Sequence, residues 1–167
     1  MKRIFLSLTI LGLALGPQAP AQDTTKAAAP PNTAPEKPKQ TQEELELAFK
    51  NTLTKATLTG RWCLVQDGKL SQEKEDKYTI TGVSKIGGDM WLIHARIQYG
   101  KKDVTAPVPV QVKWAGDTPV IVVDKIPIPG SGTYSARLLI YEKTYAGTWS
   151  GGDHRGLMSG LITNEKE

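Results

Sequence analysis

The stretch MWLIHARIQY, residues 90–99, decides the fold class of this chain. Every second residue from 91 to 99 is apolar or aromatic, and His94, Arg96 and Gln98 lie between them. A period of two is typical of a strand with one buried face and one exposed face. The same alternation recurs at residues 108–114 and 134–140, and turn signals rich in glycine, proline and aspartate separate these segments.

Extending this pattern predicts about eight strands, at residues 57–66, 76–85, 90–100, 105–114, 119–127, 133–142, 144–150 and 155–163. No connection between them is long enough for a crossover helix, so the strands are expected to be antiparallel and joined in sequence. We favour a closed up-and-down barrel, because closure removes the unpaired edges of an open sheet. An antiparallel β-sandwich is the alternative.

The chain begins with features of an exported protein. Lys2 and Arg3 precede an apolar run at residues 4–15, and small residues follow it, which predicts a signal peptide at 1–21 cleaved after Ala21. The run is shorter than a spanning helix requires, so the protein is expected in the periplasm or outside the cell and not across a membrane. Residues 22–40 are rich in proline and alanine and are expected to form a disordered tether.

One domain is expected to follow the tether, at residues 41–167. The sequence TQEE at 41–44 matches a capping box, and apolar residues then recur at helical spacing, which predicts an amphipathic helix over 41–55. The alternating charges of EKEDK, residues 73–77, are typical of a solvated loop. The single cysteine, Cys63, has no partner for an internal disulfide and is expected to be packed.

Two pairs of prolines interrupt the predicted sheet. Pro107 and Pro109 lie two residues apart, as do Pro127 and Pro129, so each pair removes two backbone donors that face the same neighbouring strand. The hairpin that joins these segments is therefore expected to be unpaired at its open end.

The sequence LTGRW, residues 58–62, resembles the G-x-W opening of calycin barrels, the group that contains lipocalins and avidins. Gly60 and Trp62 match this opening. The resemblance implies a barrel with the tryptophan packed at its base, often beneath an arginine of the last strand, for which Arg155 is the candidate. The predicted helix is similar to the one that closes the lower end of a lipocalin. The residues after Trp62 differ from those with which avidins hold biotin, so the resemblance does not imply biotin binding.

The chain also resembles small secreted bacterial proteins that end in a glycine-rich segment with a histidine, here TYAGTWSGGDHRG at residues 144–156. Gly151 and Gly152 predict a tight turn that places Asp153, His154 and Arg155 at a barrel rim. These side chains either complete the turn, with the arginine over Trp62 or Trp149, or form a binding rim in which Arg155 holds a carboxylate.

Charge and motifs argue against several function classes. Twenty-one basic residues oppose 17 acidic ones, and they alternate along the chain, so no nucleic-acid partner is expected. The two histidines lack the paired spacing of zinc sites, and no cofactor or metal is expected. No G-x-S-x-G or H-E-x-x-H motif is present, so no catalytic residue is assigned and no enzymatic activity is expected.

The sequence therefore favours a barrel that binds a small hydrophobic molecule. A structural or interaction domain with a filled core is the alternative, and a hydrolase is a third. The volume inside the barrel separates the first two. Gly60 and Trp62 are structural signature residues, and the candidate ligand-binding residues are Trp91, Tyr99, Trp114, Tyr134, Trp149, His154 and Arg155.

Overall fold

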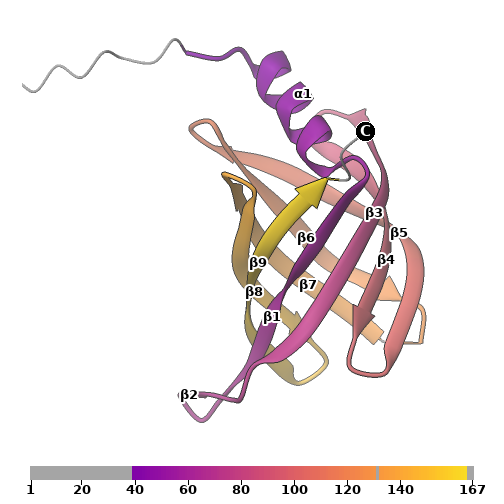
Figure 1. Ribbon diagram of the computed structural model, residues 1–167, viewed down its shortest axis with the longest axis vertical. Coiled ribbons are helices and arrows are strands. Elements are labelled where there is room, and N and C mark those ends of the chain that lie inside the picture. Colours follow the sequence, from indigo (N-terminus) through magenta and orange to yellow (C-terminus); the bar gives the residue numbers. More distant parts are fainter. Residues whose placement is uncertain (1–38, 131, 165–167) are drawn as a thin grey trace, which may run out of the picture. The chain divides into compact units, whose positions relative to one another are not determined.

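The computed structural model describes residues 39–130 and 132–164. The predicted signal peptide, and all but the last two residues of the predicted tether, lie outside these ranges. Within them no helix has the length and apolar character that crossing a membrane requires. Figure 1 shows one helix followed by strands, and the elements are α1 (Gln42–Leu53), β1 (Ala56–Gln66), β2 (Lys69–Leu70), β3 (Lys74–Gly87), β4 (Met90–Tyr99), β5 (Lys102–Ala115), β6 (Thr118–Ile128), β7 (Gly132–Tyr141), β8 (Thr144–Gly151) and β9 (His154–Asn164).

The strands form a closed antiparallel barrel. Strands β1 and β3 to β9 pair in sequence, and β9 returns to pair with β1 from Ala56↔Asn164 to Leu64↔Gly156. The short β2 pairs only with the end of β1. The predicted eight-stranded up-and-down barrel is confirmed, and the sandwich alternative is wrong because one continuous sheet closes on itself.

Helix α1 packs against the end of the barrel where β1 begins. The predicted capping box is present: the Thr41 hydroxyl accepts a hydrogen bond from the Glu44 N–H, and the Glu44 carboxylate accepts one from the Thr41 N–H. The buried Phe49 ring meets Trp91 edge-on, with centroids 5.2 Å apart, and Asn164 at the end of β9 donates to two carbonyl oxygens of the helix end. We call the opposite end of the barrel, which carries the β4–β5, β6–β7 and β8–β9 turns, the mouth.

The loop predicted at residues 73–77 is wrong. Strand β3 begins at Lys74 and pairs with β1, and Asp76 lies inside the barrel wall with 3 % of its surface exposed. The alternating charges predicted a loop because Lys74 and Asp76 occupy the inner face of the strand, where an alternating strand pattern would have apolar residues. The charge run therefore supplies two polar groups to the interior.

The ladder between β5 and β6 is incomplete, as the prolines predict. Within the described ranges these strands pair only from Gln111↔Val122 to Ala115↔Thr118, whereas β5 continues back to Lys102 and β6 continues to Ile128. We call the unpaired stretch between residues 102–110 of β5 and residues 123–130, which are the end of β6 and the start of the turn after it, the seam.

Candidate ligand-binding cavity

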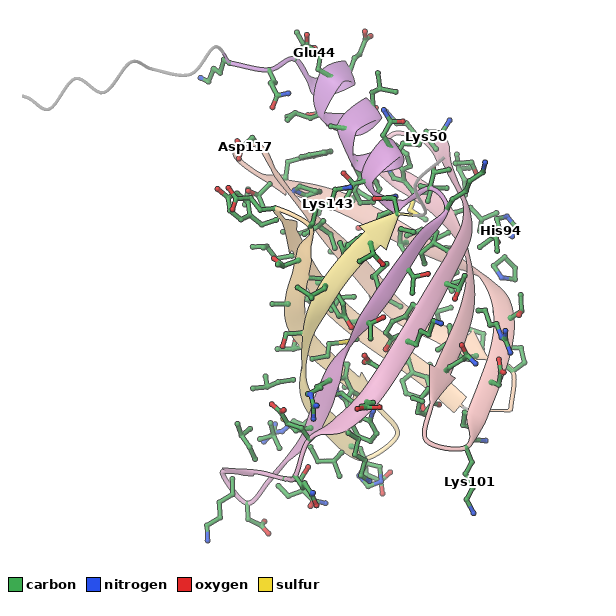
Figure 2. All side chains as sticks on the ribbon, in the orientation of Figure 1. Glu44, Lys50, His94, Lys101, Asp117 and Lys143 are labelled. Atoms are coloured by element: carbon green, nitrogen blue, oxygen red, sulfur yellow. The ribbon has the colours of Figure 1, made fainter. Side chains whose placement is uncertain are left out.

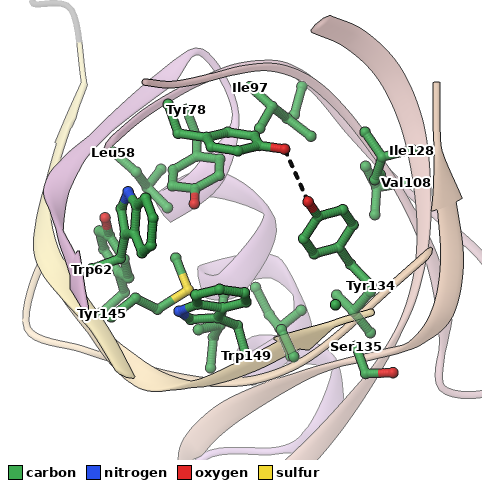
Figure 3. A pocket seen from close by; sticks show the side chains of 18 of the residues that line it. Leu58, Trp62, Tyr78, Ile97, Val108, Ile128, Tyr134, Ser135, Tyr145 and Trp149 are labelled. Carbon is green, nitrogen blue, oxygen red and sulfur yellow. Dashed lines mark hydrogen bonds between the residues drawn. The ribbon is translucent and has the colours of Figure 1, made fainter. Parts of the chain in front are cut away.

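The barrel encloses a cavity of about 470 Å³ that extends from Leu53, at the end of α1, to His154 at the mouth. Its deeper part is aliphatic because the inward positions near α1 carry branched side chains. These are Leu58, Ile80, Ile93, Val110 and Ile121. Aromatic residues line the rest of the cavity, and Figure 3 shows five of them, namely Trp62, Tyr78, Tyr134, Tyr145 and Trp149. The sixth is Tyr99. The interior is therefore lined but not filled.

Glycines on the inner face explain why so many rings leave space between them. A Cβ added at Gly151 would lie 2.6 Å from the Tyr134 ring, one at Gly156 would lie 2.7 Å from Trp149, and one at Gly160 would lie 2.7 Å from Tyr145. Each of these rings thus lies close against a wall position that has no side chain. Rings that projected toward the barrel axis would occupy the cavity instead.

The side chain of Tyr145 extends across two neighbouring strands, because glycines lie beneath it on both. From β8 it lies over Gly160 of β9 and Gly60 of β1, and its hydroxyl donates to Asp76 of β3 at 3.0 Å. Gly60 is therefore required for the passage of Tyr145. The glycine of the G-x-W opening acts here by close approach, because it has no positive φ.

Asp76 is the only buried charged residue in the described part of the chain, and the Tyr78 hydroxyl also donates to it, at 3.1 Å. Burial raises the pKa of the Asp76 carboxyl, and the hydrogen bonds from Tyr145 and Tyr78 act in the opposite direction. Burial and the neighbouring Asp76 charge raise the pKa of both tyrosines, so both remain protonated donors near neutral pH.

Polar groups gather near the mouth. The Tyr99 and Tyr134 hydroxyls are 3.1 Å apart, and burial raises the pKa of Tyr134 to about 12 (Figure 3). The Lys74 ammonium lies 5.2 Å from the centre of the Trp62 ring. The indole N–H groups of Trp62 and Trp149 are buried and have no hydrogen-bond partner among the described residues. Lys74 and the Tyr99–Tyr134 pair, which line the cavity, are therefore the polar groups that a ligand would meet at this level.

The structure brings four of the seven predicted binding residues to the cavity, namely Tyr99, Tyr134, Trp149 and His154. Trp91 and Trp114 instead contact Phe49 at the α1 end, where Trp114 also borders a separate hollow of about 260 Å³. Arg155 is exposed and does not line the cavity.

Sequence reasoning missed four residues of the cavity and its wall: Lys74, Asp76, Tyr78 and Tyr145. Lys74, and not Arg155, supplies the cation over Trp62. Tyr145 shares a strand face with Trp149, so the period of two contained the signal for it. The other three lay in or beside the charge run that was predicted to be a loop.

The remaining polar candidates are dispersed. His94 is exposed on the outside of the barrel (Figure 2), and Cys63 is free and buried. Residues 39–130 and 132–164 contain no group of three or more histidine, cysteine, aspartate or glutamate side chains that could hold a metal ion. In comparisons with protein-family models, curated proteins and solved structures, no match to this chain is found, so the cavity itself carries the functional inference.

Proposed function

We propose that this protein is an exported, calycin-like carrier that binds a small amphipathic molecule inside its barrel. The observation that carries the proposal is the cavity of about 470 Å³ with an aliphatic floor. Ligand pockets for drug-sized molecules span roughly 300–1,000 Å³ and combine apolar walls with a few polar groups. A structural domain with a filled core would not need this space, and an empty apolar cavity of this size is costly to maintain.

The distribution of polar groups orients the ligand. The apolar part lies deep, against Leu58, Ile93 and Val110, where burying apolar surface contributes about 25 cal/mol per Å². The polar part lies at the mouth, within the region of Lys74 and the Tyr99–Tyr134 pair. A molecule with one apolar end and one polar end fits this gradient.

Filling the cavity tests the proposal. Ala136→Phe places a ring in the cavity wall, and Ala146→Phe places the same ring on the exposed outer face of β8. We expect Ala136→Phe to weaken binding of 11-(dansylamino)undecanoic acid by about tenfold or more, because the ring occupies ligand space, and Ala146→Phe to leave it unchanged. Fluorescence titration measures both, and circular dichroism checks folding.

Equal affinity in the two variants, or no binding by the unmodified protein, would contradict the carrier function. Native mass spectrometry of protein from its own host provides a second measurement. We expect the unmodified protein to carry an adduct that the Ala136→Phe variant lacks. We also expect the mass of the chain to correspond to a protein that starts at Gln22. A chain that retains residues 1–21 would contradict export.

A further inference from the structure

The direction of successive backbone N–H groups explains why β5 and β6 do not pair along the seam. In an antiparallel ladder, successive N–H groups of one strand point alternately to its two neighbours. The Val112 N–H donates to the Asp89 carbonyl at 2.8 Å, and the β4–β5 register continues without a shift to Tyr99↔Lys102. Even-numbered N–H groups of β5 therefore face β4. The nitrogens of Pro107 and Pro109 face β6, where they have no proton to donate.

Strand β6 turns toward β7 at the same level. The β6–β7 register shifts between Val123 and Ile126, and Lys125 has a φ of 50°. The Lys125 N–H donates to the Ser135 hydroxyl at 3.0 Å, and the Arg137 guanidinium donates to the Val123 carbonyl at 2.7 Å. Two backbone groups of this bulge, the Lys125 N–H and the Val123 carbonyl, are thus bonded to side chains of β7.

The cavity extends to the seam from inside. Val108 on the β5 side and Val123 and Ile128 on the β6 side all line it, and Figure 3 shows Val108 and Ile128 on the same side of the cavity. At the rim the Lys102 ammonium donates to the Gly130 carbonyl. The seam is therefore bounded by a side-chain contact at the mouth and by the Gln111–Val122 pair in the wall, with apolar residues between them.

We propose that the seam is a side opening through which the apolar chain of the ligand passes between solvent and cavity. This proposal rests on the proposed carrier function, and it identifies the ligand as a molecule with a single linear apolar chain. Separating β5 from β6 here breaks no backbone hydrogen bonds, whereas each such bond elsewhere in the wall contributes about 1 kcal/mol. A narrow slot between two strands admits one chain more readily than a fused ring system.

Two features favour this route over alternatives. At the mouth a chain would have to pass the Tyr99–Tyr134 hydrogen bond and the Lys74–Trp62 contact. An added peptide strand does not fit the seam, because strand addition depends on main-chain hydrogen bonds and Pro107 and Pro109 offer none as donors. The inner side of the seam instead presents Val108, Val123 and Ile128, whose apolar side chains suit an alkyl chain.

Blocking the seam tests the proposal. In a Cys63→Ala background we would introduce Thr105→Cys at the seam, which keeps both prolines, Asp153→Cys in the β8–β9 turn at the mouth, and Thr148→Cys on the outer face of the fully paired β8, and attach PEG-maleimide to each. Stopped-flow fluorescence with 11-(dansylamino)undecanoic acid gives association and dissociation rates. We expect the label at position 105 to slow both rates by about tenfold with little change in affinity, and labels at 148 and 153 to change them less than about twofold.

The outcomes separate the two proposals. Slowing by the label at 153 but not at 105 would show that the ligand uses the mouth, which overturns the side opening and leaves the carrier function standing. No binding by the unlabelled protein would overturn both. Hydrogen exchange provides a ligand-free check: the Val108 and Val110 amides should be protected and the Thr105 amide should exchange rapidly, and a protected Thr105 would contradict an unpaired seam.

Discussion

Gly60→Ala is expected to destabilise the barrel by about 3 kcal/mol or more, and to lower its melting temperature by about 10 °C. An added Cβ would overlap the Tyr145 hydroxyl and the backbone carbonyl of Ser159. The backbone cannot relax freely, because Gly60 is paired with Gly160 on one side and Asp76 on the other. Displacing Tyr145 would also weaken its hydrogen bond to the buried Asp76, which adds to the cost of overpacking.

Gly87→Ala is the matched control, because a Cβ at Gly87 meets no heavy atom within 4 Å and its φ is not positive. Its free energy of unfolding should change by less than about 0.5 kcal/mol. Urea unfolding of the two variants measures the difference. Adding Tyr145→Phe to Gly60→Ala removes one of the two overlapping atoms, so the double variant should lose less stability than the sum of the two single losses. A loss equal to that sum would contradict the proposed overlap.

Tyr145→Phe is expected to cost about 2 kcal/mol of stability at neutral pH, because it removes one of the two hydroxyl donors that stabilise the buried Asp76 carboxylate. The ring itself keeps its place over Gly160, so no large cavity forms. Tyr141→Phe is the control, since Tyr141 is 52 % exposed and its hydroxyl interacts with the exposed Glu142 and not with a buried charge. We expect that variant to unfold at nearly the same urea concentration as the unmodified protein.

The cost of Tyr145→Phe should depend on pH in a defined direction. Burial raises the folded-state pKa of Asp76 above its unfolded value, so the folded protein takes up the proton first as pH falls. The stability linked to this proton is fully present below the unfolded pKa and is lost as pH rises through the folded pKa. Losing the Tyr145 donor raises the folded pKa further, so the deficit of the variant should grow with rising pH.

Urea unfolding at pH 4 and at pH 8 measures this dependence. A deficit of the same size at both values would contradict ionisation of Asp76 within the folded barrel. Asp76→Asn carries no titrating group at this position, and it should therefore remove the part of the pH dependence that arises there.

The fold could be predicted because its signals are local. The period of two in β4, the turn residues between strands and the capping box at Thr41 act over a few neighbouring positions. The incomplete β5–β6 ladder was also predictable, since a missing proton on Pro107 and Pro109 is a property of the residue type. These features need no knowledge of which strands meet across the barrel.

The contents of the interior were less predictable. Trp91 and Tyr99 lie on one face of the same strand, yet Trp91 packs against α1 and Tyr99 lines the cavity at the other end. Periodicity fixes the face of a strand and not the height at which each side chain meets its neighbours. Asp76 was missed because it lies in a run of charged residues, and its donor Tyr145 is 69 positions away and reaches it only when the barrel closes.

The sequence alone determined an antiparallel sheet of about eight strands, a capped helix before it and two proline-containing strands that pair poorly, because each depends on backbone geometry at adjacent residues. The tertiary structure alone decided that the barrel is hollow. That outcome depends on glycines at 60, 151, 156 and 160, because the absence of a side chain there lets aromatic side chains from other strands pack close to the wall. Such pairings exist only once strands distant in sequence are side by side, which no local pattern specifies.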